Sequence, residues 1–214
     1  MKGAFITGTD TGVGKTYFTT FWVRSLRQAG VPALPLKPIS SGDRSDAESL
    51  YRSVDEAIPI EEINPIHFNR PLAPLTACRI SHQVFPREAL HRHLDTLQSK
   101  YPGPFLVEGV GGWRVPFDHD FGVREWAREL NLPVVVVARA GLGTLNHVLL
   151  TIDSILQAHL PVLGIILNLH EALDDDATRT NPQILQELTG LPVFLLPVQA
   201  EPVQELPTWL SLRT

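Results

Sequence analysis

Continuous runs of aliphatic residues recur along the chain and alternate with longer stretches in which apolar and polar residues mix. The runs predict strands over residues 3–6, 33–36, 105–107, 133–137, 162–167 and 193–196. The run of four valines at 134–137 lacks the apolar–polar alternation of a half-exposed strand. Such runs are typical of strands that are covered on both faces, as in parallel sheets.

The stretches between these runs predict helices over residues 15–29, 87–100, 122–130, 145–158 and 181–190. Gly30 is a typical helix C-cap, and Asn181 and Pro182 are expected as the N-cap and first residue of the last helix. Alternating strands and helices predict one doubly wound α/β domain over residues 1–214, with a mostly parallel sheet flanked by helices. Residues 40–81 are less regular and proline-rich, so we expect a long excursion over the active face there.

Composition narrows the class of protein further. Hydrophobic residues make up 43% of the 214 residues, which excludes a disordered chain or a collagen-like repeat. The net charge of -5 argues against general nucleic-acid binding. The lone Cys78 excludes an intrachain disulfide and a multi-thiolate metal site, and it favours a reducing compartment. No export signal or span of about 20 apolar residues is present, so we expect a cytoplasmic protein without membrane contact. The acidic triplet at 174–176 is expected in a solvated loop.

The strongest chemical signal lies between the first predicted strand and the first predicted helix, where the sequence reads GTDTGVGKT over residues 8–16. This is the context of a P-loop, in which glycines let backbone N–H groups close around phosphate and the helix N-terminus adds positive partial charge. Lys15 can reach the β- and γ-phosphates, and the Thr16 hydroxyl can ligate Mg²⁺. Five residues separate Gly8 from Gly14, where the usual P-loop has four.

Further polar side chains follow strands that should end beside the P-loop. Glu108 follows the strand at 105–107 and takes the place of a Walker-B carboxylate, a candidate Mg²⁺ ligand. Lys37 ends the strand at 33–36 and would point into the phosphate site, where a second ammonium suits charge stabilisation on a transferring phosphoryl group. Asp46 fits a helix N-cap as readily as a metal ligand. Ser41 offers a hydroxyl to an acidic substrate.

Together these motifs resemble the dethiobiotin synthetases. In chain order the matching segments are GTDTGVGKT at 8–16, KPISSG at 37–42, SDA at 45–47, VEGVGGW at 107–113, LGTLNH at 142–147 and Asn168. The five-residue spacing in the first segment is the form that this family has. The resemblance implies a homodimer of P-loop α/β subunits. It also implies an ATP-dependent cyclo-ligase of biotin biosynthesis that converts 7,8-diaminononanoate (7,8-diaminopelargonate), CO2 and ATP into dethiobiotin, ADP and phosphate with Mg²⁺.

The resemblance further implies the order of steps. One substrate amine takes up CO2 as a carbamate, and a carbamate oxygen attacks the γ-phosphate to give a carbamic–phosphoric anhydride. The second amine then closes the ureido ring and expels phosphate. Carbamate and γ-phosphate are both anions, so their approach needs fixed cations such as Lys15, Lys37 and Mg²⁺.

Residue roles follow from the same resemblance. Lys37 and Lys15 are implied to be catalytic. The implied Mg²⁺ ligands are Thr16, Asp46 and Glu108. The implied ATP-binding residues are Gly12, Val13, Gly14, Lys15, Thr16, Tyr17, Asp46, Glu108, Gly109, Val110, Gly111, Asn168, Pro197, Val198 and Gln199, of which Asn168 and residues 197–199 face the adenine. The implied substrate residues are Ser41, Gly143, Thr144, Leu145 and Asn146, the last four at a helix start on the dimer interface, where the substrate carboxylate binds.

Two positions depart from the family pattern. Gly12 stands where some members carry an acidic residue, and Leu75 stands where a histidine is expected. Both departures concern contacts to the diamine rather than the ATP chemistry.

Two other P-loop functions fit the sequence less well. Amidating synthetases of the cobyrinic-acid type usually carry a glutaminase domain with a cysteine nucleophile. Cys78, the one cysteine here, does not lie in a nucleophile-elbow motif. Partitioning or membrane-positioning ATPase switches commonly have a second lysine near the start of the P-loop, and residues 8–14 contain none. The switch is the alternative to an enzyme, and ATP hydrolysis stimulated by DNA, lipid or a partner protein would favour it.

Overall fold

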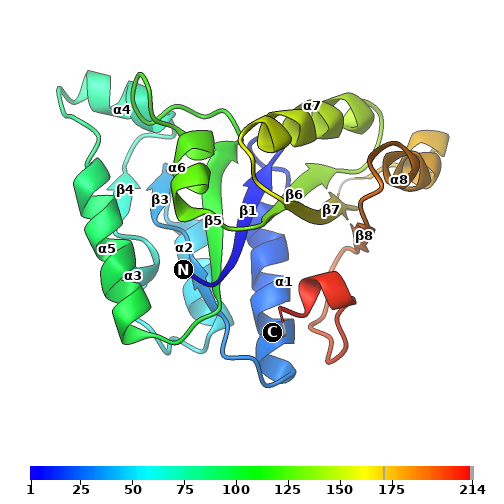
Figure 1. The fold of residues 1–214 in the computed structure, drawn as a ribbon, viewed down its shortest axis with the longest axis horizontal. Coiled ribbons are helices and arrows are strands. Elements are labelled where there is room, and N and C mark those ends of the chain that lie inside the picture. The colour runs from blue at the N-terminus through cyan, green and yellow to red at the C-terminus, as the bar shows by residue number, and fades with distance from the viewer. Residues whose placement is uncertain (171, 213–214) are drawn as a thin grey trace.

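A twisted parallel sheet forms the centre of the computed structural model, which describes residues 1–170 and 172–212 (Figure 1). In the described residues the strand order is β2-β5-β1-β6-β7-β8. The strands are β1 (Gly3–Gly8), β2 (Leu34–Leu36), β5 (Phe105–Gly112), β6 (Val134–Arg139), β7 (Val162–Asn168) and β8 (Val193–Leu196). The prediction of a mostly parallel, doubly wound α/β sheet is confirmed.

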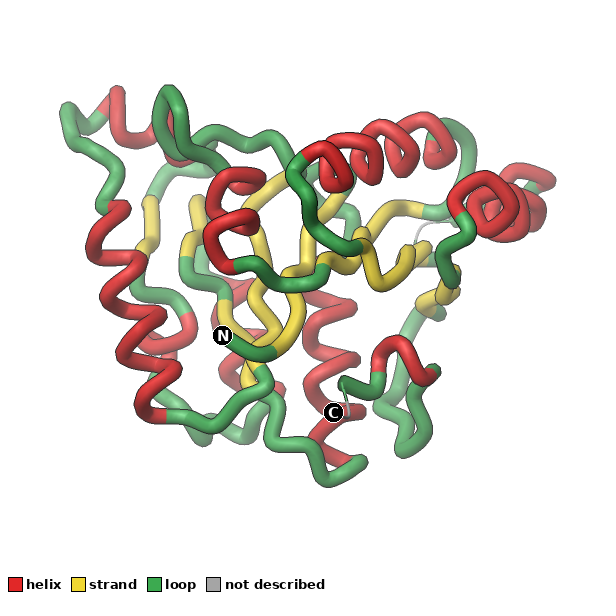
Figure 2. The backbone as a smooth tube through the Cα atoms, viewed as in Figure 1, coloured by secondary structure: helices red, strands yellow, loops and turns green. Residues whose placement is uncertain are grey.

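Helices cover both faces of this sheet (Figure 2). They are α1 (Lys15–Gln28), α2 (Ser45–Ser53), α3 (Ile60–Ile63), α4 (Pro74–Ile80), α5 (Arg87–Lys100), α6 (Val123–Leu130), α7 (Thr144–Gln157) and α8 (Asp176–Thr189), with a 3-10 turn η1 (Thr208–Leu210) near the C-terminus. Helices α1 and α2 pack together, whereas α6 and α7 pack against β5 and β6. Among the described residues, no helix is both long and apolar enough to cross a membrane.

The side chains at the centre of the sheet are buried, as the aliphatic runs predict. Val134, Val135, Val136 and Val137 are all fully buried in β6. Strand β1 lies between β5 and β6, with Ile6 opposite Glu108 and Gly8 opposite Val137. Since parallel strands end at the same edge, this register brings the residues that follow β1 beside the carboxylate of β5.

The start of α8 differs from the prediction. The helix begins at Asp176, and the side chain of Asp175 caps it by accepting a 2.8 Å hydrogen bond from the N–H of Thr178. The outer two residues of the acidic triplet are exposed, as predicted for a solvated segment, but the triplet leads into a helix: Asp175 is the N-cap and Asp176 the first helical residue, where negative charge is favourable. Asn181 and Pro182 lie inside the helix; the Asn181 amide is buried and donates to the carbonyl of Gly141 at 2.8 Å.

Residues 40–81 are also more regular than predicted. They hold α2, α3 and α4, and a small parallel sheet formed by β3 (Ile39–Ser41) and β4 (Ile66–Phe68). Buried Asn64 connects these pieces, because its amide donates to the carbonyl of Lys37 at 2.7 Å and its oxygen accepts from Ser40 at 3.0 Å. Side-chain hydrogen bonds of this kind order a segment without leaving a hydrophobic period in the sequence.

Candidate active site

The loop between β1 and α1 has the backbone of a phosphate-binding turn. Gly12 and Gly14 adopt left-handed φ values of 70° and 95°. At Gly14 a Cβ atom would lie 2.1 Å from the Asn168 amide nitrogen, so only glycine fits. That amide donates to the carbonyl of Val13 at 3.1 Å and holds the loop against the end of β7. The N-terminus of α1 therefore faces a preformed turn, where an anion binds favourably.

A cleft of about 510 Å³ opens at this end of the sheet. It brings together ten residues that the sequence predicts for the site, namely Gly12, Gly14, Lys15, Thr16, Tyr17, Lys37, Ser41, Asp46, Val110 and Gly111. Three more of the predicted residues, Val13, Glu108 and Gly109, are buried and do not line the cleft. The cleft has the size and polar groups of a small-molecule site.

An ion-pair network forms the floor of this cleft. Fully buried Glu108 accepts hydrogen bonds at Oε1 from Lys37 Nζ at 2.6 Å and from Thr16 Oγ1 at 2.7 Å. Its second oxygen accepts from Thr19 Oγ1 at 2.9 Å. Lys37 Nζ also donates to Asp46 Oδ2 at 2.5 Å. The buried ammonium is thus held between two carboxylates, which offset the cost of its burial.

The network keeps Lys37 charged. Burial by itself lowers the pKa of Lys37, but Glu108 and Asp46 outweigh this effect and raise that pKa above its ordinary value. Burial likewise raises the pKa of Asp46, but the nearby Lys37 outweighs it and leaves the Asp46 pKa below its ordinary value. At neutral pH Lys37 is therefore a fixed cation rather than a proton acceptor.

Lys15 has a different environment. Its ammonium is buried and donates to the carbonyl of Asp10 at 3.1 Å. Burial, helped by repulsion from Lys37, lowers the pKa of Lys15 to about 8. A polyanion in the cleft would supply the missing negative charge and favour the protonated amine. Lys15 is therefore suited to hold phosphate rather than to pair with a carboxylate of the protein.

The oxygen donors at and beneath the cleft fit Mg²⁺: Thr16 and Asp46 line it, and Glu108 is buried below them. Thr16 supplies a hydroxyl and Asp46 and Glu108 supply carboxylates, which are the hard donors that this ion prefers. In the part of the chain that the structure describes, no three His, Cys, Asp or Glu side chains gather into a complete metal cage. Mg²⁺ sites commonly use one or two carboxylates and take the remaining ligands from phosphate and water.

Comparison with known proteins identifies the family. A family model described as an AAA domain matches residues 2–202. An ATP-dependent dethiobiotin synthetase from Endomicrobium trichonymphae is 36% identical over 199 residues, covering 91% of this chain and 92% of that protein. Proteins of the same name from Anaeromyxobacter sp. (strain Fw109-5) and Aquifex aeolicus are each 40% identical, covering 89% and 90% of this chain and 86% and 87% of theirs.

The chain belongs to the ATP-dependent dethiobiotin synthetase family. The resemblance stated from the motifs is thereby confirmed, and so is the prediction of an enzyme rather than a P-loop switch. The match covers most of this chain and most of each relative.

Some residues implied by the family resemblance lie away from the cleft of this synthetase. Asn168 is buried, and both ends of its side chain are engaged, the amide by Val13 and the oxygen by the N–H of His170 at 3.1 Å. Residues 197–199 follow β8, and Tyr17 donates to the carbonyl of Pro197 at 2.9 Å. The contacts of these residues to adenine stay a prediction.

The four residues implied to bind the substrate carboxylate also lie outside the cleft of one chain. Gly143 precedes α7, and Thr144, Leu145 and Asn146 form its first turn. Thr144 is buried, and its hydroxyl has no hydrogen-bond partner among the described residues. The contact of these four residues with the substrate, and the second subunit that the family resemblance implies for it, stay predictions.

Two residues of this site are missed by sequence reasoning. Thr19 lies one turn beyond Thr16 on α1, and it binds the far oxygen of Glu108. A hydroxyl at helical spacing from the P-loop threonine is the signal that could have found it. Asn64 holds the strand end that carries Lys37, and no motif marks it.

The departures from the family pattern have local consequences. Beside Gly12 lies the guanidinium of Arg139, and a Cβ atom at residue 12 would stand 3.2 Å from its Nη2. A cation therefore lies next to the position where some members carry an acid. Leu75, at the start of α4, donates its N–H to the carbonyl of Pro116 at 3.2 Å.

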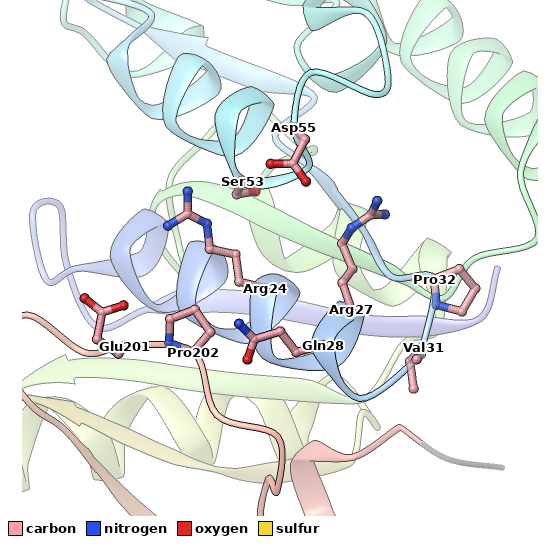
Figure 3. Close-up of a pocket in the computed structure, with 10 residues that line it drawn as sticks. Arg24, Arg27, Gln28, Val31, Pro32, Ser53, Asp55, Glu201 and Pro202 are labelled. Carbon is pink, nitrogen blue, oxygen red and sulfur yellow. The ribbon is translucent and has the colours of Figure 1, made fainter.

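A second hollow, of about 730 Å³, lies around the far end of α1 (Figure 3). It mixes the cations Arg24 and Arg27 with the carboxylates of Asp55 and Glu201. No residue of the P-loop lines it. The cleft at the start of α1, and not this hollow, is lined by predicted site residues.

Proposed function

We propose that the protein catalyses the ATP-dependent carboxylation and ring closure of 7,8-diaminononanoate with CO2, giving dethiobiotin, ADP and phosphate in biotin synthesis. The observation that carries this proposal is the convergence of Lys15 and Lys37 on one cleft beside the P-loop, with Glu108 beneath them. The names of the relatives support the product.

ATP is proposed to bind with its phosphates in the turn at residues 8–16. Residues 12–17, Asp46 and Glu108 would surround the phosphates, with Tyr17 contributing its backbone N–H at the start of α1, and residues 109–111 would line the adjoining wall. Asn168 and residues 197–199 are proposed to face the base. Thr16, Asp46 and Glu108 would hold Mg²⁺, which when bound neutralises charge on the phosphate oxygens.

The reaction is proposed to follow the carbamate route. One amine of the substrate adds to CO2 and loses a proton, and a carbamate oxygen then attacks the γ-phosphorus with ADP as the leaving group. The other amine attacks the carbonyl carbon of the anhydride and expels phosphate. Lys37 stays protonated throughout because two carboxylates hold its charge, so it stabilises negative oxygens instead of removing protons. Ser41 is proposed to orient the diamine.

Ring closure supplies the direct test of this function. Purified protein with Mg²⁺ should release phosphate from ATP only when both diaminononanoate and bicarbonate are present. With ¹³C-bicarbonate the product should be a cyclic urea that carries the label at the ureido carbon, as mass spectrometry and ¹³C NMR would show. ATP hydrolysis that needs neither substrate but responds to DNA or lipid vesicles would contradict the proposal.

A homodimer is proposed to complete the substrate site through α7. This helix exposes apolar side chains, with Leu142 just before it 95% exposed and Leu150 62% exposed. A hollow of about 380 Å³, lined in part by Leu150, Trp113 and Ser154, adjoins the same face. Burying this surface between two copies would bring the first turn of α7 from one subunit to the cleft of the other.

Replacing Leu150 with glutamate should convert the dimer to a monomer, because two carboxylates would then be buried across a twofold axis. Light scattering after size exclusion would measure the mass, and the apparent affinity for diaminononanoate should fall with it. Leu188→Glu on α8 is the matched control, since Leu188 is 63% exposed and lies on another helix. A dimer that survives Leu150→Glu would place the interface elsewhere.

We also propose that residues 1–214 act as one catalytic domain in the cytoplasm, with no nucleic-acid or membrane partner. The acidic net charge of -5 and the buried free Cys78 support this assignment.

A further inference from the structure

The segment that follows β8 is attached to α1 by three side chains of that helix. The Tyr17 hydroxyl donates to the carbonyl of Pro197 at 2.9 Å and accepts from the N–H of Ala200. Ser25 accepts from the N–H of Val203 at 3.0 Å, and Trp22 donates to the carbonyl of Leu210 at 2.7 Å. The C-terminal segment is therefore hydrogen-bonded to the helix that begins at the P-loop.

Among these attachments, Tyr17 has a special position. It lies in the first turn of α1, next to Thr16, and it lines the phosphate cleft. Ser25 is eight residues later in the helix, which places it about 12 Å farther along the axis. Among these three attachments, the Tyr17 hydroxyl holds the end of the segment that lies nearest the cleft.

Residues 197–200 depend on this hydroxyl for their shape. Regular pairing of β8 ends at Leu196, and Gln199 adopts a left-handed φ of 56°. Val198, between the two attached residues, is exposed. The hydroxyl closes this turn by bonding a carbonyl on one side and an N–H on the other, so both backbone groups lose their partner when it is removed.

We infer that the Tyr17 hydroxyl is a positioning group for the nucleotide base. It sets the distance between the turn that holds the phosphates and the wall formed by residues 197–199, and it thereby contributes to the affinity and base selectivity of the enzyme. This inference rests on the proposed assignment of residues 197–199 to the base. The hydroxyl acts through the backbone of that segment and takes no part in phosphoryl transfer.

The test compares Tyr17→Phe with Ser25→Ala. Both variants remove a hydroxyl that binds the same segment, but only the first does so beside the cleft. Tyr17→Phe removes both hydrogen bonds of the hydroxyl, to Pro197 and from Ala200. It should raise the Kd and KM for ATP about 5- to 10-fold and should reduce the ratio by which the enzyme prefers ATP over GTP and CTP. Its kcat should stay within about twofold of the wild type, because no transition-state contact is lost. Ser25→Ala should leave all of these values unchanged.

Inorganic tripolyphosphate separates base positioning from general loosening, because it has phosphates but no base. Calorimetry should show that Tyr17→Phe binds tripolyphosphate as tightly as the wild type while it binds ATP more weakly. Equal weakening of both ligands, or an unchanged Kd for ATP, would overturn the inference. These binding measurements do not depend on ring closure, so failure of the proposed reaction in the wild-type enzyme would be recognised separately.

Discussion

Replacing Lys37 with alanine should lower kcat for ring closure about 10²- to 10³-fold, the effect of removing one fixed charge that stabilises a transition state. Lys37 is buried at the base of the cleft, and two carboxylates keep it charged. Its ammonium is therefore in place before carbamate and γ-phosphate approach each other. The Kd for ATP should change little, since the P-loop and Lys15 hold the ground-state phosphates.

The measurement is phosphate release under saturating substrates, together with ATP binding by calorimetry. Lys100→Ala is the matched control, because Lys100 pairs with Glu62 at 2.6 Å on the surface and away from the cleft. A thermal scan would establish that both variants are folded. Turnover of Lys37→Ala at the wild-type rate would remove Lys37 from the mechanism.

Replacing Glu108 with glutamine should lower the free energy of unfolding by about 3–5 kcal/mol, because it leaves Lys37 buried with a single, half-exposed carboxylate partner. The second substitution Lys37→Met should recover much of this loss by removing the uncompensated charge. The double-mutant cycle, measured by urea denaturation, isolates the coupling between the two side chains.

Glu62→Gln serves as the comparison for a surface pair and should cost much less, since water screens the Lys100–Glu62 interaction. Strictly additive losses in the Lys37 and Glu108 cycle would contradict a coupled buried pair. The result also concerns catalysis. If Lys37 and Glu108 are coupled, the Glu108 carboxylate contributes both to the stability of the fold and to the position of the proposed catalytic lysine.

The parallel sheet and the P-loop were predictable because their signals are local. A short run of β-branched residues such as Val134–Val137 favours a strand that is buried on both faces, and Gly-Lys-Thr after a strand is typical of phosphate binding. Lys37 and Glu108 could be placed for a related reason. Lys37 follows β2, and Glu108 lies within β5 beside the end of β1, where neighbouring parallel strands bring their polar side chains together.

Features that depend on contacts between distant segments could not be predicted in the same way. Asn181-Pro182 has the local form of a helix start, but Asp175 caps the helix earlier and Asn181 is used to bind Gly141. The segment around Asn64 combines polar bonds that no motif marks with core residues such as Ile58 and Ile63 that follow no long hydrophobic period. The base wall and the dimer face stay predictions because their occupants are a nucleotide and a second subunit.

The strand order has a consequence for biosynthesis of the enzyme. Strand β1 delivers the P-loop and β2 delivers Lys37, yet the two are not neighbours, because β5 is inserted between them. A nascent chain that has left the ribosome only as far as Lys37 contains both lysines, but it does not yet contain β5, the strand that pairs with both β1 and β2. The catalytic centre can assemble only after synthesis has passed Gly112, the end of β5, so its formation waits on a pairing between segments far apart in the chain.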